Sequence, residues 1–180
     1  MKRAIFISTA IVFIVISTPA DAQQEDGNSS GKVEFAELNP EQKVDVAVRN
    51  LSATMLLGIE YAKMHGQTPF EYGKFLGSRF APTWEEHKGK GVTYFVEDLH
   101  KVFQTSKAFD MEVMKQAEDL VTFRMKRVFY PYMESYPDAE LTREEYDRFL
   151  NGLMQEITGY LGFETNNQKD GDWLVYTISR

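Results

Sequence analysis

Apolar residues recur at helical spacing in four stretches of the chain. The first stretch follows Asn39 and Pro40, where asparagine can cap a helix and proline suits the first helical position. Its apolar residues lie three or four positions apart, at Val44, Val48, Leu51, Met55, Ile59 and Ala62. This spacing predicts one long amphipathic helix. The apolar residues beside the stripe predict that this helix is contacted on more than one side; they are Val46, Leu56, Leu57 and Tyr61.

A second helix is predicted to begin at Thr68, which forms a capping box with Glu71. Gly73 and Gly77 lie one turn apart within it. Two small residues at this spacing favour close packing against another helix, and a notch that faces a ligand is the alternative. Pro82 must kink or interrupt the helix, because proline lacks the N–H donor and clashes with the preceding turn.

The remaining helices are predicted over residues 91–106 and between Thr142 and Gly162. The first of these has a strong apolar stripe made by Val92, Phe95, Val96, Leu99, Val102 and Phe103. In the last helix, Thr142 and Glu145 form another capping box, and Gly162 ends the helix. Its stripe is Tyr146, Phe149, Leu150, Leu153, Ile157 and Leu161.

Between and after these helices the apolar pattern changes to period two, which is typical of strands. Residues 111–115 and 120–127 are predicted to form a hairpin, and residues 173–178 a last strand that pairs with 120–127. Residues 166–172 are polar and are predicted to be a turn. The fold class is therefore α+β, with about four helices packed on a small antiparallel sheet of about three strands.

The first 22 residues have the pattern of a cleavable signal peptide. Lys2 and Arg3 precede an apolar run over residues 4–16, and the Ala20-Asp21-Ala22 triplet offers small residues for cleavage after Ala22. An uncleaved membrane anchor is the alternative, but crossing the hydrocarbon core takes roughly 20 apolar residues. We expect residues 23–34 to be a flexible leader and 35–180 to form a single domain, located in the periplasm or outside the cell.

Composition narrows the function classes. The chain has no cysteine, so a lipoprotein anchor, disulfides, thiolate metal sites and cysteine nucleophiles are excluded. Its formal net charge is −7, and removal of residues 1–22 makes it about −8. An acidic surface repels phosphate backbones, so we expect no nucleic-acid binding. Beyond residue 22 no apolar run approaches the length that crosses a membrane, so we expect no membrane anchor after cleavage.

Motifs for catalysis are absent from the sequence. It contains no phosphate-binding glycine loop, nucleophile elbow, zinc-protease helix or EF-hand loop. Glu86 and His87 could contribute to a metal site, but no third ligand lies near them in the sequence. We therefore predict no metal and no cofactor, and a protein more suited to binding than to catalysis. The enzymatic alternative uses His100 as a general base, with Glu97 three residues earlier on the same helix face to orient it.

A ligand site is predicted where the second strand ends. Arg124 and Arg127 precede an aromatic tract containing Tyr130, Tyr132 and Tyr136. Cations and phenols together can bind a small anionic or planar molecule through cation–π contacts and hydrogen bonds. In the alternative interpretation these rings cover the open end of the core.

The C-terminal half resembles one broad family in its layout. A strand running into a proline, VTFRMKRVFYP, is followed by a capped helix, FLNGLMQEITGYLG, and a closing strand, DGDWLVYTISR. This order is similar to that of the amino-thiazoline-carboxylate hydrolases and the related vinyl-reductase-like small-molecule-binding domains. The resemblance implies their fold and a ligand pocket. It does not extend to the hydrolase cysteine, because Val128 and Phe129 occupy that neighbourhood.

These observations predict an exported domain that binds a small molecule or a partner, with a hydrolase-like enzyme using His100 and Glu97 as the alternative. The candidate partners are a small-molecule ligand, an envelope protein, or a second copy of the chain in a homodimer.

Overall fold

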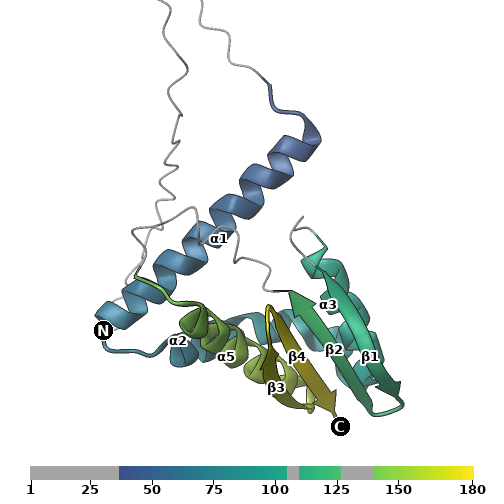
Figure 1. The fold of residues 1–180 in the computed structure, drawn as a ribbon. Coiled ribbons are helices and arrows are strands. Elements are labelled where there is room, and N and C mark those ends of the chain that lie inside the picture. Colours follow the sequence, from purple (N-terminus) through teal and green to yellow (C-terminus); the bar gives the residue numbers. More distant parts are fainter. Residues whose placement is uncertain (1–36, 105–109, 127–139) are drawn as a thin grey trace, which may run out of the picture. The chain divides into compact units, whose positions relative to one another are not determined.

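The computed structural model describes residues 37–104, 110–126 and 140–180. These belong to one structural unit, Glu37–Arg180 (Figure 1). Its elements in chain order are α1 (Pro40–Met64), α2 (Pro69–Phe80), the 3-10 helix η1 (Ala81–His87), α3 (Val92–Phe103), β1 (Met111–Ala117), β2 (Leu120–Lys126), α5 (Arg143–Leu161), β3 (Glu164–Asp170) and β4 (Trp173–Ser179). The predicted α+β class is confirmed.

The predicted helix starts are confirmed at atomic detail. The side chains of Asn39, Thr68 and Thr142 each accept a hydrogen bond from the backbone N–H three residues later. The side chain at that later position accepts one in turn from the backbone N–H of the cap residue. Such a reciprocal pair satisfies two donors that a helix leaves without partners. Gly162 ends α5 with a φ of 80°, a conformation that glycine adopts without a Cβ clash. Pro82 interrupts the second helix as predicted, since the chain continues past Phe80 as the 3-10 helix η1.

The sheet has four antiparallel strands in the order β1-β2-β4-β3, so the expectation of about three strands is corrected. The extra strand is β3, which lies over residues predicted to be a polar turn. It is polar because it is an edge strand with mostly exposed side chains. The turn is only two residues long, since Asp170 pairs with Trp173, and Gly171 has a φ of 56°.

The core lies against one face of this sheet. β2 and β4 pair as predicted, and their register places Val121 opposite Ile178 and Phe123 opposite Tyr176. The Phe123 and Tyr176 rings stack with centroids 5.6 Å apart. These four side chains are at most 2% exposed and join one cluster with buried residues of α3 and α5. Both helices therefore pack on the same face of the sheet.

Two helices cross at backbone contact. A Cβ at Gly73 of α2 would lie 2.1 Å from the carbonyl oxygen of Phe149, and one at Gly152 of α5 would lie 2.2 Å from that of Phe70. A Cβ at Gly77 would also meet α5, 2.7 Å from the carbonyl oxygen of Leu153. The interpretation of Gly73 and Gly77 as close-packing residues is confirmed.

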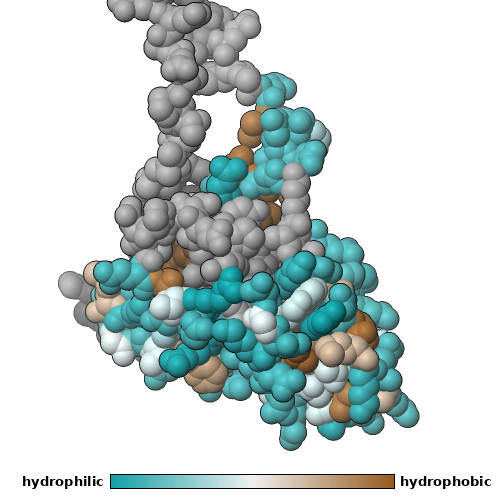
Figure 2. Space-filling view, in the orientation of Figure 1, coloured by the Kyte–Doolittle hydropathy of each residue, from teal (hydrophilic) through white to brown (hydrophobic). Residues whose placement is uncertain are grey.

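Helix α1 differs from its prediction. Its buried residues, Ser52, Leu56, Ile59 and Ala62, all lie in its C-terminal half. Leu56 is 2% exposed, whereas Val46, Leu57 and Tyr61 are 38%, 61% and 64% exposed, so the expectation of contacts beside the stripe holds only for Leu56. Figure 2 shows apolar side chains between polar ones along this helix. Within the described ranges, no helix combines the length and the apolar character needed to cross a bilayer.

Candidate functional site

A cavity of about 820 Å³ lies between α1, the α2–η1 segment, α3 and α5. Most of its lining side chains are apolar. They are Val48, Leu51, Met55, Phe80, Trp84, Leu99, Val102, Phe103, Phe149, Leu150, Leu153, Met154 and Ile157. Leu51 and Val102 are 51% and 53% exposed, so the cavity is open to solvent on their side.

The cavity wall follows from the helical spacing of α5. Phe149, Leu153 and Ile157 lie four residues apart, which places their side chains on one face of the helix. The sequence identified this stripe as core, and the structure shows that it is both core and cavity wall. A stripe that faces a cavity has the same spacing as one that faces a filled core, so the spacing in α5 did not indicate the cavity.

Polar side chains interrupt the apolar wall at one place. Thr83, Glu86 and His87 from η1, and Asp98 and Lys101 from α3, also line the cavity. A mostly apolar cavity with a few polar groups is the usual composition of a small-molecule site, because the polar groups orient the ligand.

His87 is the buried member of this polar group, at 3% exposed. It packs among aromatic rings, with centroids 5.0 Å from Trp84 and 5.1 Å from Tyr94. Its Nε2 lies 2.9 Å from Oδ2 of Asp98. An ionised carboxylate can only accept, so the ring donates this hydrogen bond through Nε2–H.

Asp98 is held by two donors. Lys101, one turn later on α3, places its Nζ 2.5 Å from Oδ1, while His87 bonds to Oδ2. The hydrogen bond from Lys101 and then that from His87 hold the pKa of Asp98 below its ordinary value. The carboxylate is therefore charged at neutral pH and fixes the orientation of the imidazole.

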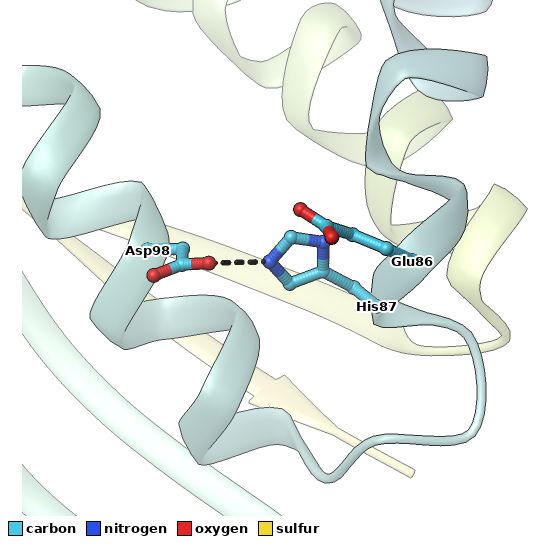
Figure 3. Close-up of side chains that lie close together, drawn as sticks. All are labelled: Glu86, His87 and Asp98. Atoms are coloured by element: carbon cyan, nitrogen blue, oxygen red, sulfur yellow. Dashed lines mark hydrogen bonds and ion pairs between the residues drawn. The ribbon is translucent and has the colours of Figure 1, made fainter.

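Glu86, His87 and Asp98 form a cluster with metal-ligand chemistry (Figure 3). One ligand atom from each side chain lies within 4.8 Å of the other two. The sequence showed no third side chain of this chemistry near the Glu86–His87 pair, and the fold brings Asp98 to it. Asp98 is 11 residues beyond His87 and on a different element, so no local spacing in the sequence linked them.

The His100 and Glu97 side chains of the enzymatic alternative lie elsewhere on α3. Both line a smaller cavity of about 200 Å³ between α3 and the β1–β2 hairpin. Gln104, one turn after His100, donates a hydrogen bond from its Nε2 to the His100 Nδ1 at 3.5 Å. Within the described residues, no hydrogen bond or ion pair joins His100 to Glu97.

The predicted ligand site at the end of the second strand lies mostly outside the described residues. Arg127, Tyr130, Tyr132 and Tyr136 all belong to residues 127–139. Arg124 is described, and its Nε donates to Oε2 of Glu112 at 2.8 Å. Its guanidinium carbon lies 4.5 Å from the centre of the Trp173 ring. Arg124 therefore binds neighbouring strands and does not line the large cavity.

Comparisons with known proteins give weak structural similarities. No protein-family model matches the sequence, and no curated protein matches it. Among solved structures, the chain is similar to the Fe(II) unliganded H-NOX protein of K. algicida, with 10% identity and a TM-score of 0.34. That match covers 62% of this chain and 60% of the other.

Two further matches are of the same kind. A mutant of the K. algicida protein is 14% identical over 87% of this chain and 81% of its own, with a TM-score of 0.33. A Cs H-NOX mutant with 4-cyano-L-phenylalanine at site 5 is 15% identical, and the match covers 82% of this chain and 76% of the other, with a TM-score of 0.39. All three TM-scores are below 0.5, so these similarities do not establish a shared fold, function or ligand for this chain.

Proposed function

We propose that the chain is an exported binding protein for a small, largely apolar molecule, which it holds in the cavity between α1, η1, α3 and α5. The observation that supports binding is the cavity itself, which has a volume of about 820 Å³ and a mainly apolar wall. Small-molecule sites have volumes of about 300–1,000 Å³ and walls of this kind. The signal-peptide pattern of residues 1–22 supports export.

The wall also indicates the chemistry of the ligand. Binding becomes more favourable by about 25 cal/mol for each square ångström of apolar surface that the ligand removes from water. Glu86, Asp98 and Lys101 sit at one part of the wall, and Lys101 already pairs with Asp98. An anionic ligand would meet the remaining charge of Glu86 there, so the favoured ligand is neutral or cationic at its polar end.

A fluorescence titration tests this function. The probe is N-phenyl-1-naphthylamine, which is uncharged and brightens in apolar surroundings. Trp84 lines the cavity and Trp173 does not, and these are the two tryptophans of the chain. In a Trp173→Phe background, we expect saturable binding of one probe per chain with energy transfer from Trp84.

Matched substitutions locate the probe. Val102→Glu places a charge on the cavity wall, whereas Val44→Glu places one at a similarly exposed position on α1 that does not line the cavity. A bound probe would cover the new side chain, and covering even an uncharged polar group without a partner costs about 1–3 kcal/mol, so we expect roughly tenfold weaker binding in Val102→Glu. Equal binding by the two variants, or no saturable binding by the parent chain, would contradict the proposed site.

A further inference from the structure

His87 has one ring nitrogen whose bonding is incomplete. Its Nδ1 is buried and has no hydrogen-bond partner among the described residues. A buried polar atom left without a partner destabilises the fold, so such atoms are rare in folded proteins and indicate a missing partner. His87 itself is only 3% exposed and lines the large cavity.

The Asp98 hydrogen bond determines what that partner is. Because Nε2–H donates to the Asp98 carboxylate, a neutral imidazole carries its lone pair on Nδ1. That nitrogen needs a donor or a cation. The arrangement in which a carboxylate holds one ring nitrogen while the other binds a metal ion is common in metal sites, where it fixes the tautomer and raises ligand basicity.

Glu86 supplies a second ligand at the same place. It precedes His87 on η1, and Figure 3 shows its carboxylate close to the imidazole, with Asp98 at the other side of the ring. The Glu86 side chain is exposed, so a cation can reach it from solvent. Lys101 balances the charge of Asp98, which leaves the charge of Glu86 to attract a cation.

We infer that Glu86, His87 and Asp98 form a binding site for a divalent transition-metal ion of the zinc class. The ligands are the Glu86 carboxylate and His87 Nδ1, and Asp98 is a positioning residue that holds the ring through Nε2–H. An imidazole nitrogen favours zinc-class ions over Mg²⁺ and Ca²⁺, which prefer oxygen ligands. The other coordination positions are left for water or for a molecule in the cavity. This site does not depend on the proposed function, since a metal ion can bind whether or not the cavity holds a ligand.

Calorimetric titration with ZnCl₂ tests the site. The chain has three histidines, so a His65→Gln, His100→Gln background leaves His87 as the only imidazole. After removal of bound metal with a chelator, we expect one Zn²⁺ to bind per chain and MgCl₂ to bind at least tenfold more weakly. Absence of Zn²⁺ binding would overturn the inference.

Neighbouring carboxylates give controls of equal charge. Glu86→Gln and Asp98→Asn should each weaken Zn²⁺ binding by about tenfold or more, since even residues that only orient a ligand cost 10–100-fold when changed. Glu85→Gln and Glu97→Gln each remove one charge from an adjacent position, and we expect changes of no more than about twofold. Equal losses in a test variant and its control would overturn the inference.

Nitrogen NMR separates a metal ligand from a structural role. In the same background labelled with ¹⁵N-histidine, Zn²⁺ should shift the Nδ1 resonance of His87 strongly, while Nε2 keeps its proton. A metal-induced shift confined to Nε2, or to neither nitrogen, would overturn the assignment. Because Glu86 is exposed, the Glu86→Gln variant is expected to fold, and its spectrum without metal should match that of the parent.

Discussion

Glu145 joins the start of α5 to the end of α1. Its Oε1 lies 2.8 Å from Nζ of Lys63, and its Oε2 accepts from the backbone N–H of Thr142 at 2.8 Å. Partial burial acts to raise the pKa of Glu145, but the Lys63 and Thr142 hydrogen bonds outweigh it and bring the pKa below its ordinary value of 4.5. A carboxyl with a lowered pKa stabilises the fold while it is ionised.

We expect Glu145→Gln to lower the free energy of unfolding by about 1 kcal/mol or less at pH 7, because glutamine keeps the capping box and loses only the charge. The difference from the parent should persist above about pH 4.5 and shrink as the pH falls through the lower folded pKa of Glu145. Urea unfolding at several pH values measures it. Glu144→Gln, at an exposed pair with Lys169, should have a smaller effect. An undiminished difference for Glu145→Gln in acid would contradict the charge as its cause.

The sequence could predict contacts between side chains that lie near each other in the chain. Thr142 and Glu145 are three residues apart, so their capping box could be predicted from this spacing alone. The hydrogen bond between His87 and Asp98 could not be predicted in this way, because it depends on how η1 and α3 pack. The ligand site expected at Arg127, Tyr130, Tyr132 and Tyr136 lies outside the described residues and stays a prediction.

At the element scale, the crossing of α2 and α5 depends on glycine. Gly152→Ala would force a Cβ into the Phe70 carbonyl, where both partners are backbone and neither can turn aside. We expect it to lower the free energy of unfolding by at least about 2 kcal/mol. The same change at Gly159, in the same helix with open space around it, should instead raise it by about 0.5–1 kcal/mol, because alanine favours the helix.

Chemical denaturation of both glycine variants, followed by circular dichroism, measures this contrast. A stabilised or unchanged Gly152→Ala protein would show that the two helices can separate without cost. A loss of equal size in Gly159→Ala would show that helix propensity, and not the crossing, controls the effect.

The elements themselves differ in how well pattern predicted them. Strands β2 and β4 have alternating or continuous apolar residues because they lie over the core, and both were predicted. Strand β3 has no apolar alternation, since it is an edge strand with mostly exposed side chains. The sequence feature that could have indicated a strand here is Gly171, which lies in a two-residue hairpin turn just before the correctly predicted strand β4.

At the scale of the whole molecule, the cavity arises from four helical segments that do not fill the space between them. Each segment has an ordinary apolar stripe, so the volume they leave is a property of their arrangement and not of any one sequence pattern. The resemblance of the C-terminal half to the small-molecule-binding domains implied a pocket, and its membership of that family stays a prediction. Most of the cavity is made by α1, η1 and α3, which lie outside the resembling half.

Residues 1–22 determine where the whole chain is expected to go. Small residues at Ala20 and Ala22 fit the shallow pockets of signal peptidase, and Pro19 ends the apolar run before them. When the full chain is produced in a Gram-negative bacterium, we expect the periplasmic protein to begin at Gln23, as measured by its intact mass. Replacing both Ala20 and Ala22 by arginine should leave an uncleaved precursor.

The position of the folded unit makes this test informative for binding as well. The described unit begins at Glu37, so cleavage after Ala22 removes no residue of the cavity or of the Glu86–His87–Asp98 cluster. The processed protein should therefore bind the naphthylamine probe with the same affinity as a chain begun directly at Gln23. A periplasmic product that keeps Lys2 and Arg3 would show that residues 1–22 act as an anchor, and the ligand would then have to reach the cavity at a membrane surface.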